Sequence, residues 1–189
     1  MKVIKPILLV VATGILGCEQ RNHAVSQTPQ STAVTFRPLA SVQEIMLSVI
    51  DPNIDPIWNS ISTISTAEGV VEKRPQTEEE WAQLERHAIA LQEAANLLLI
   101  EGRKVAHEGN KTSIHHSELH APEIEKAIAE NRQLFNQLVH GFQDAAGKAL
   151  SAIREKNVEA LEAAGEAVEA GCEACHSRFW YPGDKRPTQ

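Results

Sequence analysis

Cys172-Glu173-Ala174-Cys175-His176, close to the C-terminus of the 189-residue chain, is the stretch that decides how the other segments are interpreted. Two cysteines three positions apart with a histidine directly after them form the attachment pattern of a c-type haem. On a helix both thiols share one face, so each can reach one vinyl group of the same porphyrin. His176 follows one step round the helix and can meet the iron as the proximal ligand. The stretch predicts one covalent haem c, held by Cys172 and Cys175.

The same motif has three other interpretations: half of a zinc site, a redox-active cysteine pair, or a chance occurrence. A zinc site normally needs two further ligands with matched spacing, and the sequence has no second cysteine pair. A thioredoxin-like pair would follow a strand in a βαβ unit, of which the sequence shows no sign. The pattern therefore favours haem attachment.

The composition is that of a helical protein. Aromatic residues make up only 4% of the chain, and the length suits one domain whose four-helix core is large enough to be stable. The formal net charge is −7. Such an acidic surface argues against nucleic acid as a partner and suits docking to a basic patch on a redox partner protein.

Residues 1–17 are predicted to be a bacterial lipoprotein signal. A short positive region precedes an apolar run at residues 7–17, which is too short to span a bilayer. Ile15-Leu16-Gly17-Cys18 resembles a lipobox, so Cys18 is the expected lipidation site, and an ordinary cleaved signal is the alternative. Removal of the signal leaves 16 Lys and Arg against 25 Asp and Glu, a net charge of −9.

The segment after Cys18 is rich in Gln, Ser, Thr, Asn and Pro and shows no apolar period, as in a flexible tether. The expected location is therefore the periplasm, on a membrane, with the outer membrane favoured because Glu19 follows the cysteine. The predicted boundaries are a signal at 1–17, a tether at 18–38, a four-helix cytochrome domain at 39–182 and a polar tail at 183–189.

The first helical pattern begins at Ser41, which suits an N-cap and forms a capping box with Glu44. Two Asp-Pro pairs follow, and each proline disfavours helix in the residue before it, so we expect a break or kink near residues 50–55. The helix should then resume and end at Glu68-Gly69. Its expected apolar positions are Ile57, Trp58, Ile61 and Ile64.

The second helix has the clearest pattern in the chain. Thr77 and Glu80 form another capping box, and apolar residues follow at spacings of three and four from Trp81 to Leu98. Gly102 is expected to end it.

Two more helices complete the predicted fold. Pro122 suits the first turn of the third helix, which should extend to a polar turn at residues 155–157. The fourth helix carries the haem motif and ends at Pro182-Gly183. No segment alternates at period two for long enough to be a strand. The predicted fold class is all-α, a four-helix bundle with haem bound on its C-terminal helix.

A four-helix bundle with its haem motif on the last helix resembles the class II cytochromes c, the cytochrome c-prime group. The resemblance covers residues 40–181 as an architecture, and its closest matches are the motif itself and Phe179, the aromatic residue three positions after the histidine. It implies that the two cysteines are thioether anchors and that the histidine is the proximal ligand. The class often has a basic residue four positions after the histidine, where this chain has Trp180.

The class divides at the sixth iron ligand. Low-spin members take a methionine from the first helix, whereas high-spin members have an apolar residue there and leave the iron open. Met46 lies on the apolar face of the first predicted helix, and the other methionine is the initiator. The resemblance therefore makes Met46 the candidate distal ligand, and the alternative is a core residue.

Several other side chains are candidates to line the haem pocket: Trp58, Trp81, His87 and Phe179. His87 lies at the edge of the inward stripe of the second helix, where it can ligate iron, bond a propionate or be a buried polar group. The tryptophans can pack on the porphyrin or belong to the core. The loop from His107 to His120 holds half of the histidines at a spacing that matches no standard metal site.

These patterns predict a monohaem cytochrome that carries electrons as its iron alternates between Fe(II) and Fe(III). A methionine ligand would favour Fe(II). The alternative is a five-coordinate haem protein that binds nitric oxide or carbon monoxide. An enzyme is not expected, because peroxidase chemistry needs a distal acid or base and His87 is the one candidate. Expected partners are redox proteins and, through Cys18, a membrane; a homodimer is a further possibility.

Overall fold

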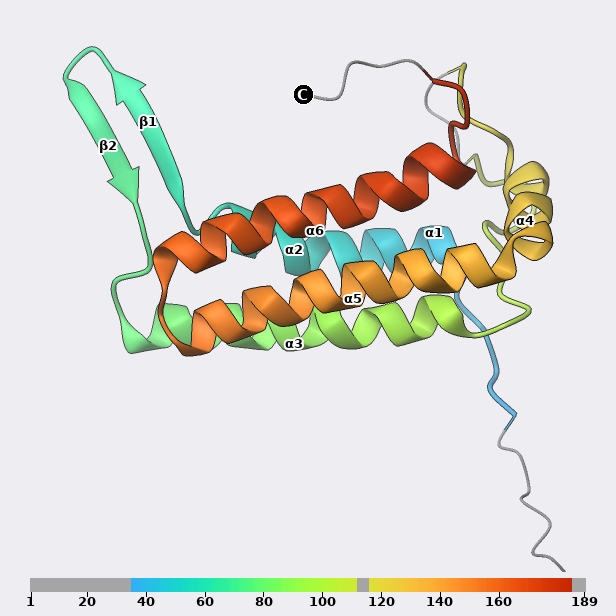
Figure 1. Ribbon diagram of the computed structural model, residues 1–189, viewed down its shortest axis with the longest axis horizontal. Coiled ribbons are helices and arrows are strands. Elements are labelled where there is room, and N and C mark those ends of the chain that lie inside the picture. Colours follow the sequence, from blue (N-terminus) through green and yellow to red (C-terminus); the bar gives the residue numbers. More distant parts are fainter. Residues whose placement is uncertain (1–34, 112–115, 185–189) are drawn as a thin grey trace, which may run out of the picture. The chain divides into compact units, whose positions relative to one another are not determined.

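The computed structural model describes residues 35–111 and 116–184, which form a helical bundle with one small hairpin (Figure 1). The signal, Cys18 and the tether as far as residue 34 lie outside the described residues. In chain order the elements are α1 (Val42–Ile45), the π-helix η1 (Met46–Ile50), α2 (Asp51–Trp58), β1 (Ser62–Thr66), β2 (Gly69–Lys73), α3 (Glu78–Leu99), α4 (Ala121–Glu130), α5 (Arg132–Arg154) and α6 (Val158–Phe179).

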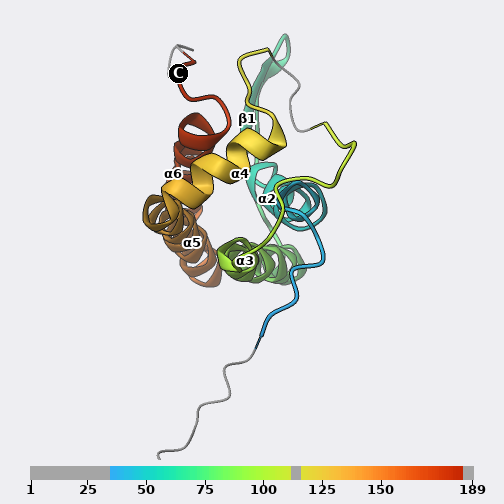
Figure 2. The same ribbon diagram turned by 90° about the vertical axis from the view of Figure 1, so that its right-hand side faces the viewer.

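Four helical limbs make up the bundle. The first limb is α1, η1 and α2 together, and the others are α3, α5 and α6. Each limb packs on the next in the order α2, α3, α5, α6, and α4 lies across one end against α5 and α6 (Figure 2). The predicted four-helix architecture is confirmed. The side between α2 and α6 is the least closely packed.

The first limb stays helical through its prolines. Ser41 and Glu44 form the predicted capping box, with the Glu44 carboxylate accepting from the Ser41 N–H at 2.8 Å. The Asp51 N–H donates to the Met46 carbonyl, five residues back, so the expected interruption is a π turn rather than a break. Pro52 has no N–H and its ring would press on the carbonyl four residues back, and the wider turn relieves this conflict.

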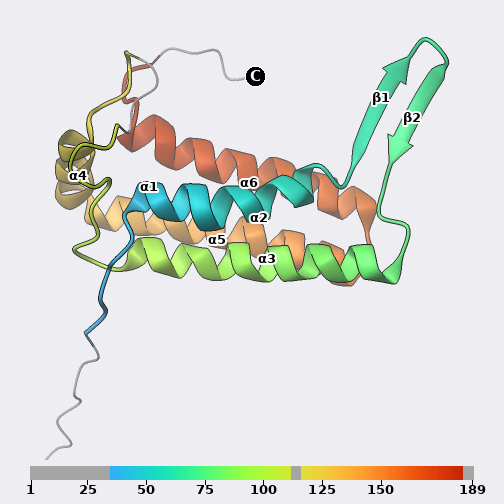
Figure 3. The same cartoon turned by 180° about the vertical axis from the view of Figure 1, so that it is seen from behind.

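A β-hairpin follows where the sequence predicts more helix. β1 and β2 pair antiparallel, with Ile64 opposite Val71, so the predicted continuation of the first helix through Ile61 and Ile64 is wrong, as is the expectation of no strand (Figure 3). β-branched residues occupy three of the five positions in β1 and two of the five in β2, and they favour extended backbone. Gly69 has a φ of 136°, which suits the tight turn between them.

α3 begins with the predicted capping box. The Glu80 carboxylate accepts from the Thr77 N–H at 2.8 Å, and the Thr77 side chain accepts from the Glu80 N–H. Ion pairs between Lys156 and Glu78 and between Arg154 and Glu85 join this end of α3 to the turn between α5 and α6. The start of α3 therefore lies at the end of the bundle where α6 begins.

The predicted third helix is two helices. Asn131, with φ −128° and ψ 37°, separates α4 from α5, so the expectation of one helix from Pro122 is wrong. The Asn131 side chain donates to the Ala127 carbonyl at 3.0 Å. Asparagine competes in this way for backbone partners and is unfavourable inside a helix. The break turns α4 across the bundle end near the last turns of α6.

The core runs the length of the bundle. Its largest fully buried side chains are Phe179, Leu91, Ile124, Ile153 and Leu161. Alanines on α5 and α6 let these two helices approach closely. Within the described residues, none of the helices has both the length and the apolar character needed to cross a membrane.

Candidate haem-binding site

The motif lies on the last two turns of α6. The helix begins at Asn157, whose side chain accepts from the Ala160 N–H at 3.0 Å, and helix-favouring residues follow. It ends where the N–H groups of Trp180 and Tyr181 both donate to the His176 carbonyl, at 2.8 and 3.1 Å. Both cysteines are free thiols and, like His176, are half-buried. This local geometry presents two thiols and one imidazole within five residues.

One side of α6 is closed by α5 at the level of the motif. A Cβ on Gly171 would lie 3.2 Å from the Cα of Phe142, so glycine is needed for this close approach. Phe179 is 1% exposed, and its ring meets Phe135 edge to face with centroids 5.5 Å apart. A porphyrin bound to the motif therefore has no room between α5 and α6.

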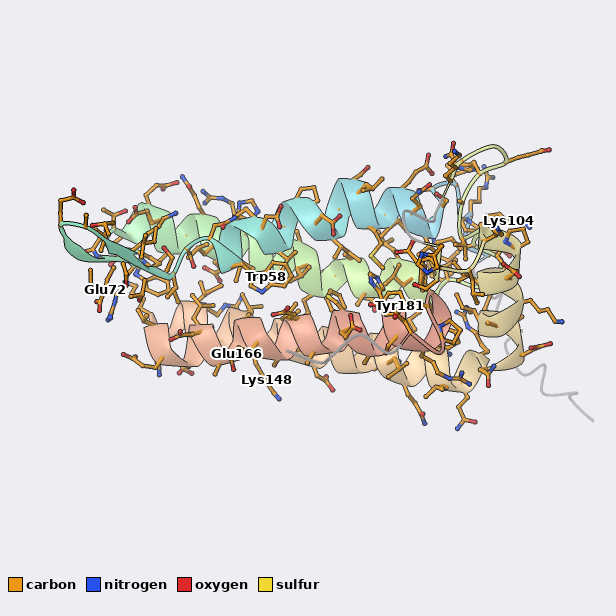
Figure 4. All side chains as sticks on the ribbon, turned by 90° about the horizontal axis from the view of Figure 1, so that it is seen from above. Trp58, Glu72, Lys104, Lys148, Glu166 and Tyr181 are labelled. Carbon is orange, nitrogen blue, oxygen red and sulfur yellow. The ribbon has the colours of Figure 1, made fainter. Side chains whose placement is uncertain are left out.

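The other side of α6 faces α2. The indole Nε1 of Trp58 donates to the Gly165 carbonyl at 3.2 Å, and a Cβ on Gly165 would lie 3.3 Å from the Trp58 ring. Figure 4 shows Trp58 between the first limb and α6, and Tyr181 at the far end of α6. The two helices run antiparallel (Figure 1). Trp58 thus fixes the register of the first limb against the motif-bearing helix.

That register can be counted from the Trp58–Gly165 bond. Asp51 lies seven residues before Trp58, and Cys172 lies seven residues after Gly165, about 10 Å along each helix. One further turn brings Met46 to about the height of His176. No Cα of α1 or η1 lies within 8 Å of a Cα in α6. The first limb therefore diverges from α6 toward the motif, which is the geometry a porphyrin between them requires.

The surroundings of the two thiols do not favour a thiolate. Burial raises the pKa of Cys172 to about 11 and that of Cys175 to about 12. A redox-active pair needs the opposite, a thiolate stabilised at neutral pH. In the described part of the chain no three His, Cys, Asp or Glu side chains are grouped to hold a metal ion.

His176 is held in the neutral form. Burial lowers the pKa of its imidazole, and the charges of Glu173, Asp51 and Glu118 act against this by a smaller amount. A neutral imidazole keeps the lone pair that a metal ligand donates. The charged groups that act on His176 are all carboxylates.

Two aromatic rings follow the motif and lie beside its histidine. The ring of Trp180 is 5.3 Å from that of His176, and the ring of Tyr181 is 6.3 Å away and nearly perpendicular to it. The Tyr181 hydroxyl donates to the Glu173 carboxylate, and the Leu119 N–H donates to the Trp180 carbonyl at 2.7 Å. These contacts fix the end of α6 and shield one side of the imidazole.

The two candidates for the distal side lie on different limbs. Met46 opens the π-helix, is half-buried and packs against the core. The Nδ1 of His87 is bonded to the Asn53 side-chain oxygen at 2.9 Å, which ties α3 to α2. His87 thus already has a partner in the protein, whereas Met46 lies at the height of the motif.

The other predicted pocket residues are dispersed. Trp58 lies about 10 Å from the motif along α6, and Phe179 faces α5. Trp81 is 8% exposed in the first turn of α3, at the end where α6 begins, about 20 Å along α6 from Cys172. The structure does not bring Trp81 to the motif.

In the described part of the histidine-rich loop, His107 and His120 have partners other than the motif. The Nε2 of His107 contacts the Glu44 carboxylate at 2.9 Å, at the start of the first limb. His120 precedes α4, and its N–H donates to Glu123. His115 lies outside the described residues.

With this geometry in place, comparison with known families is decisive. The family model described as Cytochrome C' matches residues 77–180, more than half of the chain. The chain belongs to the cytochrome c′ family. The match runs from α3 to the end of α6 and includes the haem motif, but it leaves out the first limb with Met46 and Trp58. Comparisons with curated proteins and with solved structures return no match.

The residues present fit the haem c that the cytochrome c′ family implies. Two unpaired, protonated thiols lie within one helical turn, a neutral imidazole follows them, and the neighbouring limb diverges on the same side. The protein is a haem-binding c-type cytochrome, and the motif on α6 supplies two thiols followed by one imidazole.

From the sequence, Trp180 was noted only as the residue in place of a basic one, and Tyr181 and Asp51 were not identified as neighbours of the motif. Tyr181 and Trp180 were available from spacing, because residues four and five positions after His176 lie close to it at a helix end. Asp51 was interpreted only as part of a helix-breaking Asp-Pro pair. Its place opposite Cys172 depends on the Trp58–Gly165 contact, which no local pattern encodes.

Proposed function

We propose that this cytochrome c′ family member is an electron carrier with a single haem c and Met46 as its sixth iron ligand. The observation that carries the proposal is the register of the first limb, which brings Met46 to about the height of His176 on the diverging side of α6. Met46 also begins a π turn, and such turns are frequent at functional sites.

Each side chain has a defined part in this function. Bound haem c supplies a one-electron Fe(II)/Fe(III) couple. Cys172 and Cys175 hold the group on α6, neutral His176 donates to the iron, and the Met46 sulfur would favour the ferrous state. Trp180 and Tyr181 keep water from the proximal imidazole.

Absorption spectroscopy tests this proposal directly. We expect mature protein made with haem-attachment machinery to give a low-spin ferric spectrum with a methionine–iron charge-transfer band. Met46→Ala should abolish that band, whereas Leu47→Ala, a change at the exposed neighbour, should leave it intact. Cys172→Ala/Cys175→Ala should lose all covalent haem. A high-spin ferric spectrum that Met46→Ala does not alter would exclude Met46 as a ligand.

A second function is favoured by one observation. Met46 packs against the core, and a methionine committed to the core would leave the iron five-coordinate. The protein would then bind nitric oxide or carbon monoxide at an open distal side. Ready carbon monoxide binding by the ferrous wild-type protein would support this alternative over the carrier.

We further propose that the cytochrome works at a membrane surface in the periplasm. Cys18 at the end of a lipobox-like segment supports lipidation, and the acidic chain supports docking to basic patches on redox proteins. Fractionation of cells that express wild-type protein or Cys18→Ser tests the tether: recovery of both proteins in the soluble fraction would reject it.

A further inference from the structure

One exposed carboxylate of the first limb lies at the height of the haem motif. Asp51 is the first residue of α2, and α2 is the part of that limb that approaches α6. Asp51 lies two helical turns from the Trp58–Gly165 hydrogen bond along α2, and Cys172 lies two turns from it along the antiparallel α6. The two residues are therefore at the same height. The backbone thus fixes Asp51 at the point where the two helices begin to diverge.

The charge of Asp51 acts on both the first and the last residue of the motif. It contributes to the electrostatic surroundings of the Cys172 thiol and of the His176 imidazole, and His176 in turn acts on Asp51. Asp55, one turn further along α2, interacts with Asp51 but is not among the groups that act on Cys172 or His176. Asp51 is therefore the α2 carboxylate with electrostatic access to the site.

The Asp51 carboxylate has no bonded cation in the part of the chain that the structure describes. Across residues 35–111 and 116–184, Asp51 has no ion pair and no side-chain hydrogen bond. The nearest arginine on α6, Arg178, is turned toward α5: its guanidinium lies 5.8 Å over the Phe179 ring and 3.5 Å from the Asn131 side chain. Trp180, four positions after His176, carries no charge. A negative charge at Asp51 therefore acts on the motif without an ion-pair partner among the described residues.

We propose that Asp51 lines the haem slot opposite Cys172 and lowers the reduction potential of the haem by holding a negative charge beside it. Ferric iron carries one more positive charge than ferrous iron, so a nearby carboxylate stabilises the ferric form. Asp51 acts on the haem through its charge and does not bind the iron. The inference rests on haem attachment at Cys172 and Cys175, and holds whether the iron carries electrons or binds a gas.

Spectroelectrochemical titration of three variants tests the proposal. At a fixed ambient potential, Asp51→Asn should raise the ferrous-to-ferric ratio about fivefold, an upward shift of about 40 mV because tenfold is 59 mV for one electron. Asp51→Glu keeps the charge and should retain the wild-type potential. Asp55→Asn removes a carboxylate from the same helix and should change the ratio less than twofold. The shift in Asp51→Asn should shrink as ionic strength rises.

Two outcomes would overturn the role of Asp51. An unchanged potential in Asp51→Asn, with covalent haem retained, would show that its charge does not reach the haem. An equal shift in Asp51→Asn and Asp51→Glu would trace the effect to shape and not to charge. Absence of covalent haem from the wild-type protein would instead contradict the proposed function itself.

Discussion

At the scale of single residues, the haem site depends on glycines that allow close packing as much as on the residues of the haem motif. Gly171, directly before the haem motif, lets the backbone of α5 approach α6, and Gly165 makes room for the Trp58 ring. These two contacts hold α6 from two different sides. They fix the direction in which Cys172 and His176 can present their side chains, which leaves the divergent side toward α2 for the haem.

Alanine substitution at two helical glycines separates packing from helix propensity. At Gly141, nothing lies within 4 Å of a built Cβ, so Gly141→Ala should stabilise the fold by about 0.5–1 kcal/mol. At Gly171, the Cβ would meet the Phe142 backbone, and we expect Gly171→Ala to be at least about 1 kcal/mol less favourable than Gly141→Ala. Urea unfolding of both variants measures the difference. Equal effects would show that α5 and α6 are not in close contact at the motif.

At the scale of elements, the sequence predicted helices best where caps and apolar spacing agree. Both capping boxes, at Ser41 and Thr77, were predicted correctly, because each is a local arrangement of four residues. The motif was found for the same reason. The hairpin at Ser62–Lys73 was missed because its strands are short and exposed and show no alternation of polar and apolar residues.

Relations between elements could not be predicted from local patterns. The prolines at 52 and 56 were expected to break or kink the first helix, and a π turn absorbs the conflict and keeps Met46 and Asp51 on one limb. The register of that limb depends on one tryptophan and one glycine 107 positions apart in sequence. Such a pairing is settled by packing in three dimensions, which periodicity does not encode.

The capping box of α3 should make stability depend on pH. The pKa of Glu80 is held below its ordinary value of 4.5, first by the Gln76 N–H and then by that of Thr77. The ionised carboxylate therefore stabilises the folded state at pH values above about 4.5, and this contribution is lost as the pH falls through the lowered pKa.

Glu80→Gln should remove that dependence. We expect the variant to be less stable than wild type at pH 7, with the difference shrinking as the pH falls below the lowered pKa, because only the wild-type carboxylate becomes protonated. Urea unfolding at pH 7, 5, 4 and 3 measures this. Glu162→Gln, an exposed change on α6, is the matched control. A gap between Glu80→Gln and wild type that stays constant down to pH 3 would contradict the prediction.

At the scale of the whole molecule, the bundle and the hairpin differ in how far their side chains are buried. The four limbs share one core, whereas the hairpin projects away from them (Figure 1). Every residue of the hairpin except Ser62 is exposed. Ile64, Val70 and Val71 are more than half exposed in the single chain. An isolated two-stranded hairpin is marginal in water. The hairpin therefore adds little to the stability of the monomeric bundle.

Shortening the hairpin tests this separation. Replacing residues 64–71 by Asn-Gly joins the paired residues Thr63 and Glu72 through a two-residue turn. We expect the free energy of unfolding to stay within about 0.5 kcal/mol of wild type and the haem spectrum to be unchanged, because the removed side chains are exposed. Ile57→Ala, at a core position that is 2% exposed, should cost about 2–5 kcal/mol in the same assay. A larger loss of unfolding free energy in the shortened protein, growing with protein concentration, would contradict this prediction and show that the hairpin packs against a second copy of the chain. Sedimentation analysis would then give a larger mass for the wild-type protein than for the shortened one.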